Sequence, residues 1–243
     1  MTYRSAAVCS FALVLACLLT AATDEGDVGW AERVGRTLPL VPVCSAVGAW
    51  AALAPATARG EVRALAALGR SRAQSAAGAV AGGSMVALAA SIALATVHRI
   101  DAGGFFPTIA RSDLWRWDGS GFVDFARGLL VGPRGEIERI SVADGQFAAT
   151  LERLPSHARL AAALAVALAG IGFPLLIAHA MVSRPDARVA RTDARSLFAA
   201  AAAVALTILL FQAAASGHVP ALWGVAPPAL LLAFAMQRYR AAP

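Results

Sequence analysis

Long uncharged stretches of apolar residues constrain this chain more than any other feature. A helix needs about 20 apolar residues to cross the hydrocarbon core of a bilayer. Six stretches reach or approach that length, namely residues 5–23, 37–58, 73–97, 160–183, 196–217 and 219–237. Because backbone amides in lipid must be satisfied within their own segment, we expect all six to be helices. The sequence therefore predicts an all-α polytopic membrane protein with about six transmembrane helices, in which Pro227 and Pro228 kink the last one.

The distribution of arginine predicts which ends of these helices face the cytoplasm. The chain has no lysine. Eleven of its 21 basic residues lie at the N-terminus, in the segments 59–72 and 184–195 and in the C-terminal tail, beside only three of its 15 acids. Short arginine-rich loops remain in the cytoplasm. We therefore expect a multi-pass protein of the cell inner membrane with both termini cytoplasmic, and its net charge of +6 does not indicate nucleic-acid binding.

Residues 98–157 form the main polar segment, between the third and fourth stretches. Short alternating runs there are separated by glycine-rich turns, a pattern typical of small antiparallel β elements. The arginine distribution places this segment outside the cytoplasm, in the periplasm. The chain is thus divided into transmembrane spans 1–3 (1–97), a small periplasmic β segment (98–157) and spans 4–6 (158–243).

A second short segment, residues 57–70, has the pattern of an amphipathic helix along the cytoplasmic face. Apolar residues recur there at helical spacing. Thr57 is a suitable N-cap and Gly69 a suitable helix end. Glu61 is the one acid of the segment and stands among Arg59, Arg63 and Arg70, with Arg72 just beyond.

Few residues suggest catalysis. Residues 82–84 have the G-x-S pattern of a membrane-embedded serine protease, but a nucleophilic Ser84 needs a nearby base such as His179. Small residues in membrane helices more often serve close packing. Without lysine, a phosphate-binding P-loop is impossible. We expect no catalytic, metal or cofactor site, and we interpret the three cysteines as small apolar side chains within spans: Cys9, Cys17 and Cys44.

The first stretch has a second interpretation. Arg4, the apolar run and the small residues 20–22 also fit a secretory signal peptide with a cleavage site, and residues 14–17 loosely fit a lipobox. The first span is therefore either retained or removed.

Three segments carry a family resemblance. Residues 58–71 resemble a cytoplasmic coupling helix that contains a glutamate, and residues 115–142 resemble a fragment of a periplasmic jellyroll. Residues 215–227, with the basic tail, resemble a final turn and last helix. In this order they resemble permeases of the lipopolysaccharide-export type, the LptF/LptG (YjgP/YjgQ) family, with a shortened periplasmic domain. At the outer end of the first span, where that family has basic residues, residues 24–27 are mainly acidic.

The resemblance implies a transmembrane permease subunit of an ABC-type exporter of a lipopolysaccharide-like lipid. ATP would be hydrolysed by a separate cytoplasmic ABC ATPase, so the chain itself would not be an enzyme. A second permease half and a periplasmic lipid-accepting β-domain protein would complete the assembly. The implied ATPase-coupling residues are Glu61, Val62, Leu65, Ala66 and Gly69. The implied periplasmic contacts are Trp115, Trp117, Phe122 and Phe125. A non-transporting membrane scaffold or assembly factor is the alternative.

Overall fold

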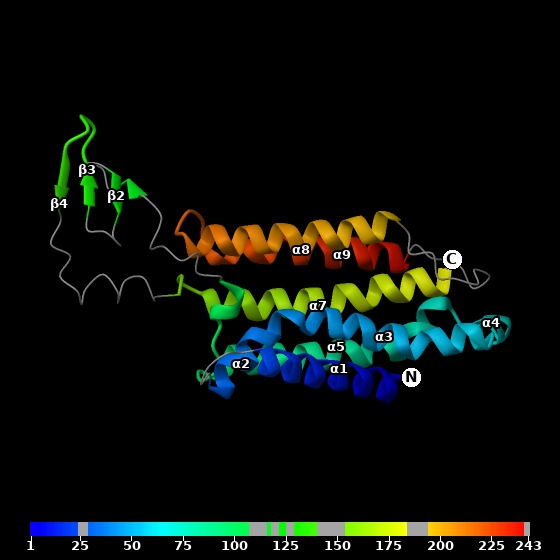
Figure 1. Cartoon of the computed structure of the whole chain (residues 1–243). Helices are drawn as coiled ribbons and strands as arrows, with labels where there is room; N and C mark the ends of the chain where they lie inside the picture. The colour runs from blue at the N-terminus through cyan, green and yellow to red at the C-terminus, as the bar shows by residue number, and fades with distance from the viewer. Residues whose placement is uncertain are drawn as a thin grey trace.

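The computed structural model shows a mostly helical chain with a small sheet beyond one end of a helical bundle (Figure 1). It describes residues 1–23, 29–106, 116–117, 122–124, 129–139, 154–183 and 194–240. The α-helices are α1 (Thr2–Thr23), α2 (Trp30–Thr37), α3 (Val41–Ala58), α4 (Glu61–Ala67), α5 (Arg72–Thr96), α7 (Ala158–Ser183), α8 (Ala194–Ala215) and α9 (Ala226–Arg240). The 3-10 helices are η1 (Leu38–Leu40), η2 (Gly103–Phe105) and η4 (Ala221–Val225).

Five helical segments are long and apolar enough to cross a membrane. They are Thr2–Thr23, Trp30–Ala58, Ala73–Thr96, Ala158–Ser183 and Arg195–Ala215. Their lengths run from 21 to 29 residues, against the roughly 20 that a bilayer requires. The first five predicted helices are therefore confirmed as long apolar helices, and the chain has the character of a membrane-embedded protein.

The last predicted span differs from a single kinked helix. It forms η4, of five residues, and then α9, of 15 residues. Pro227 and Pro228 lie in the first turn of α9, where their missing N–H groups leave no helical hydrogen bond unmade. The prediction of a kink at these prolines was wrong, because they begin the helix. The two pieces together rise about 32 Å, close to the thickness of the hydrocarbon core, and a sixth crossing stays a prediction.

Helix α7 lies at the centre of the bundle and packs against α3, α5 and α9, while α1 packs against α3 and α5. In the most apolar 18-residue stretch of each long helix, only 6% of α1 and 17% of α8 is buried, against 44–56% for the other three. The start of α1, the end of α9 and α4 lie at one end of the bundle, and the strands lie beyond the other (Figure 1). This arrangement agrees with the predicted pairing of both termini with residues 57–70 on one side.

Small side chains let the central helices approach closely. A Cβ atom on Gly83 of α5 would lie 2.7 Å from the carbonyl oxygen of Ser45 on α3. The buried Ser5 and Ser91 hydroxyls donate hydrogen bonds of 2.7 Å to carbonyl oxygens of neighbouring helices, those of Ala79 and Ala163. Glycine and serine are the residues that support such contacts between membrane helices.

The sheet consists of four described strands in the antiparallel order β1-β2-β3-β4. They are β1 (Arg116–Trp117), β2 (Phe122–Asp124), β3 (Leu129–Val131) and β4 (Ile137–Arg139). The turn between β3 and β4 uses Gly135 at a φ of 82°, a conformation that glycine adopts without strain. The predicted small antiparallel element is confirmed.

Candidate functional site

Helix α4 corresponds to the predicted amphipathic helix of residues 57–70. Thr57 is not its N-cap, because α3 continues to Ala58 and the Thr57 hydroxyl donates back to carbonyl oxygens of α3. The chain instead reverses at Gly60, whose φ of 73° favours glycine, and α4 begins at Glu61. Gly69 ends the helix as predicted. Its N–H donates to Ala66 and the next N–H to Leu65, which is the Schellman arrangement.

The predicted coupling residues do not share one exposed face. Val62 is 3% exposed and packs with Leu53 and Ala56 of α3, so it anchors α4 to the bundle. Helical spacing identifies an apolar face without saying what covers it, and in the structure α3 covers Val62. Leu65 is half-buried, and Ala66 and Gly69 are exposed.

Glu61 and Leu68 are the features of α4 best placed for an outside partner. Leu68, which the sequence analysis did not single out, is 82% exposed at the C-cap. Glu61 accepts a 2.6 Å hydrogen bond from Nε of Arg59, and the two side chains are 44% and 60% exposed. The carboxylate thus stands beside a cation at the tip of the bundle that α4 forms (Figure 1).

The predicted periplasmic contact residues are only partly described. Trp115 and Phe125 lie outside the described residues, Trp117 is in β1, and Phe122 in β2 is 51% exposed. Phe122 pairs with Val131, which pairs with Ile137, and Ile137 is 71% exposed. Residues directly opposite in neighbouring strands share a face, so these three form an apolar row across β2, β3 and β4. The sequence pattern identified Phe122 but missed Val131 and Ile137, because register is set by pairing.

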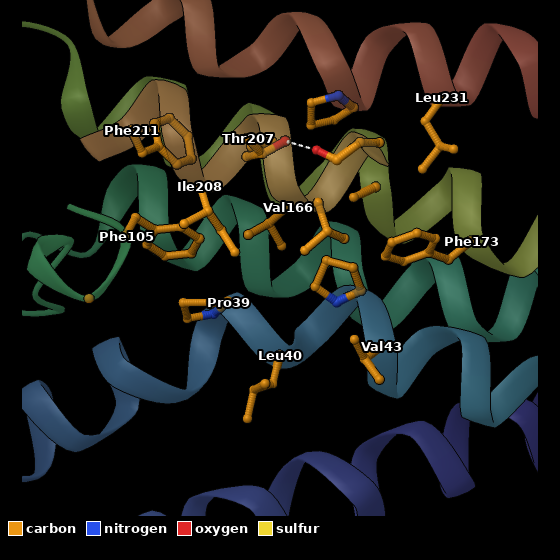
Figure 2. A pocket seen from close by; sticks show the side chains of 17 residues that line it. Pro39, Leu40, Val43, Phe105, Val166, Phe173, Thr207, Ile208, Phe211 and Leu231 are labelled. Atoms are coloured by element: carbon orange, nitrogen blue, oxygen red, sulfur yellow. Dashed lines mark hydrogen bonds between the residues drawn. The ribbon is translucent and has the colours of Figure 1, made fainter. Parts of the chain in front are cut away.

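A cavity of about 340 Å³ lies between α3, α7, α8 and α9 (Figure 2). Its wall is apolar except for Thr207, whose hydroxyl donates to the carbonyl oxygen of Ala203 at 2.7 Å. None of the described residues that line it carries a charge. The lining residues are Pro39, Leu40, Pro42, Val43, Gly104, Phe105, Ala165, Val166, Ala169, Phe173, Ala203, Val204, Thr207, Ile208, Phe211, Pro228 and Leu231. No sequence signal identified this cavity, since its walls come from segments more than 100 residues apart.

Aromatic rings close the end of the cavity nearer to the strands. Phe211 of α8 meets Phe105 edge-on at 6.3 Å between ring centroids, and Phe106 at 4.8 Å. A Cβ atom on Gly224 of η4 would overlap the Phe211 ring, so the glycine makes room for it. Figure 2 shows Phe105 and Phe211 at one end of the cavity and Phe173 at the other.

Helix α2 flanks this same end and was not predicted from the sequence. It leads directly into η1, and a Cβ atom on its Gly35 would overlap the carbonyl oxygen of Asp101 beside η2. Arg33 lies 5.6 Å from the centroid of the exposed Trp30 ring. Arg36 and Glu32 form a 2.7 Å ion pair at i,i+4, the spacing that could have revealed this helix. This closed end of the cavity is therefore bordered by an amphipathic, arginine-bearing helix.

The structure does not bring Ser84 and His179 together. The Ser84 hydroxyl lies 3.5 Å from the carbonyl oxygen of Gly170, and His179 is nine residues further along α7, about 14 Å by helix rise. The His179 ring is hydrogen-bonded to Ser183. Ser84 therefore takes part in helix packing, as small residues of membrane helices commonly do.

Comparisons of the chain with family models, with curated proteins and with solved structures give no match. The class of protein is thus defined by the fold and the cavity alone: a helical protein with at least five apolar helices of membrane-spanning length and a lateral apolar cavity among them.

Proposed function

We propose that this chain is a permease subunit of an ABC-type exporter for a lipopolysaccharide-like lipid in the cell inner membrane. The observation that carries the proposal is the apolar cavity between helices of membrane-spanning length, because a site of this composition suits acyl chains. The sequence resemblance adds the class of cargo. The chemistry would reside in a separate cytoplasmic ABC ATPase.

The two ends of the bundle support a division of roles. Helix α4 offers Glu61 and the exposed Leu68 to a cytoplasmic ATPase. At the other end, the apolar row of the sheet offers an edge or face to a periplasmic lipid-accepting β-domain protein. The sparsely buried α1 and α8 leave apolar surface for a second permease half.

The proposed orientation has its own test. Reporter fusions at Asp144 should be active only outside the cytoplasm, and fusions at Arg191 only inside, because the arginine-rich segments are retained in the cytoplasm. A fusion at Gly104, next to the outer end of α5, should agree with that at Asp144. A cytoplasmic signal at Asp144 would overturn the orientation and the assignment of α4 to an ATPase with it.

The coupling proposal is tested by charge reversal at Glu61. The tagged protein, purified in mild detergent, should retain a stoichiometric ABC ATPase that mass spectrometry identifies. Glu61→Arg should lower the retained ATPase at least about tenfold, or about 1.4 kcal/mol, because an arginine on the ATPase would lose its partner and face a like charge. Glu61→Gln should have a smaller effect, since it keeps a hydrogen-bond acceptor.

Glu32→Arg is the matched control. Glu32 also lies in the first turn of a helix and in an ion pair with an arginine, and its side chain is 47% exposed against 44% for Glu61. It lies on α2, toward the opposite end of the bundle (Figure 1). Equal ATPase retention by both charge-reversal variants and the wild type would contradict the coupling role. Absence of any ATPase would favour the scaffold alternative.

A further inference from the structure

The apolar cavity continues as a second, smaller one along the same helices. A cavity of about 90 Å³ is lined by Ala46 of α3, by residues of α7 up to Ala180 and by Ser196, Leu197 and Ala200 of α8. Both cavities share Phe173 as a wall residue. Along α7 the larger cavity extends from Ala165 to Phe173 and the smaller one from Phe173 to Ala180. The two are therefore compartments of one groove, and the Phe173 side chain divides them.

Phe173 lies near the middle of α7. Helix α7 runs for 26 residues, and Phe173 lies within about 4 Å of its midpoint by helix rise. The larger compartment covers about 12 Å of α7, close to the roughly 15 Å of one leaflet of the hydrocarbon core. It lies toward the strand end of the bundle (Figures 1 and 2). The compartment therefore matches a single leaflet in depth.

Neighbouring helices hold the backbone at Phe173 in place. A Cβ atom on Gly170 would overlap Ala87 of α5, and one on Gly172 would lie 3.5 Å from the Cα atom of Leu232 on α9. Pro174 is fully buried and has no N–H for the Gly170 carbonyl, which would be its helical partner. The Ser84 hydroxyl donates to that carbonyl oxygen at 3.5 Å. The ring of Phe173 is thus attached to a segment clamped by α5 and α9.

The surroundings of the larger compartment select what can occupy it. Among the described residues of its wall there is no charged side chain, and the one hydroxyl, on Thr207, is already bonded within α8. Helices α3 and α8 both border the compartment, but they do not pack closely against each other, which leaves a lateral opening between them. In a bilayer such a lateral opening faces hydrocarbon, which offers no hydrogen-bonding molecule to fill it. An acyl chain is the occupant that this chemistry accepts.

We propose that the larger compartment binds one acyl chain from the leaflet at the strand end, and that Phe173 sets the chain length it accepts. The proposal rests on the lipid cargo of the proposed function and adds a specificity-determining residue to it. A chain that enters laterally between α3 and α8 lies along α7, from Phe105 and Phe211 at one end to the Phe173 ring at the other. Methylenes beyond that point remain outside the groove.

Fatty acids of increasing length test this directly. Purified protein in amphipol, without detergent, would be titrated with hexanoate, octanoate, decanoate, laurate, myristate, palmitate and stearate against a fluorescent fatty acid. Each buried methylene should strengthen binding about fourfold, up to the length at which the chain reaches Phe173, and longer chains should gain nothing. Phe173→Ala should move this plateau to longer chains, because it opens a further 10 Å or so of groove along α7.

Two variants complete the test. Phe173→Trp should move the plateau to shorter chains, so the proposal remains testable without the alanine variant. Phe198 of α8 is 76% exposed and does not line either compartment. Phe198→Ala should therefore leave the plateau unchanged. Identical plateaus in the wild type and both Phe173 variants, or affinity independent of chain length, would overturn the proposal. The assay contains no ATPase, so its outcome is independent of ATPase coupling. A shifted plateau would support the acyl-chain proposal even if the coupling proposal failed. An unshifted plateau would refute the acyl-chain proposal and leave the coupling proposal standing.

Discussion

Replacing Gly82 with leucine is expected to abolish folded protein. Gly82 of α5 lies against the start of α1, where a Cβ atom would overlap the carbonyl oxygen of Thr2 and lie 2.8 Å from Cβ of Ser5. A backbone oxygen has no rotamer by which to move away, so α1 would have to separate from α5. That separation would also break the buried hydrogen bond from Ser5 to Ala79. We expect a loss of more than about 3 kcal/mol, beyond the usual range for overpacking.

The measurement is the monodispersity and thermal midpoint of the detergent-solubilised variant. Ala81→Leu introduces the same side chain one residue away, where α5 is exposed, and should behave like the wild type.

The two variants also test whether the first helix is retained or removed. If α1 were removed as a signal peptide, with a mature N-terminus near Cys17 or Thr23, Gly82→Leu would have no neighbour to overlap and would be silent.

Replacing Arg159 with alanine is expected to be the next most damaging change. Nη1 of Arg159, in the first turn of α7, donates to the carbonyl oxygens of Leu94 and Val97 at 3.1 and 2.7 Å. Nη2 donates to those of His98 and Ile100, both at 3.0 Å. One guanidinium therefore serves four carbonyls at the end of α5, where a positive charge also favours the helix dipole.

The alanine variant should lose about 3 kcal/mol, because hydrogen bonds to charged groups contribute about 1.5–3 kcal/mol each and water replaces part of them. For a chain of this size that corresponds to a midpoint lower by roughly 6–12 °C. Arg159→Lys should fall between, since an ammonium keeps the charge but lacks the planar fork of donors. Arg99→Ala removes an exposed arginine nearby and should change the midpoint by less than 2 °C or so, within the range of ordinary surface substitutions. An unchanged midpoint in Arg159→Ala would contradict the assigned role.

The placement of the long helices could be predicted from the sequence because a bilayer restricts the solutions so strongly. A charge-free run of about 20 residues has one stable structure in hydrocarbon, a helix. The same reasoning does not place the start of the last helix. Pro227 and Pro228 are compatible either with a kink inside a helix or with its first turn. Their place in the first turn of α9 depends on where the turn after Gly217 ends and η4 begins.

Local patterns predicted α4 but not its orientation. The spacing of Val62, Leu65 and Ala66 indicated a helix with an apolar face, and Gly69 indicated its end. Whether that face meets the bundle or a partner depends on the reversal at Gly60, which turns Val62 toward α3. Likewise, the polar composition of residues 29–36 concealed α2, whose packing on η2 relies on the absence of a side chain at Gly35.

By itself, then, the sequence determined the helical, membrane-embedded class of the protein and the existence of the small sheet, since apolar runs, alternation and turn residues are properties of neighbouring positions. The tertiary structure alone decided the groove, the dividing position of Phe173 and the apolar row of Phe122, Val131 and Ile137. The physical reason is that a cavity is the space left between side chains of distant segments. Its shape depends on how helices cross and on strand register, neither of which any single stretch of sequence encodes.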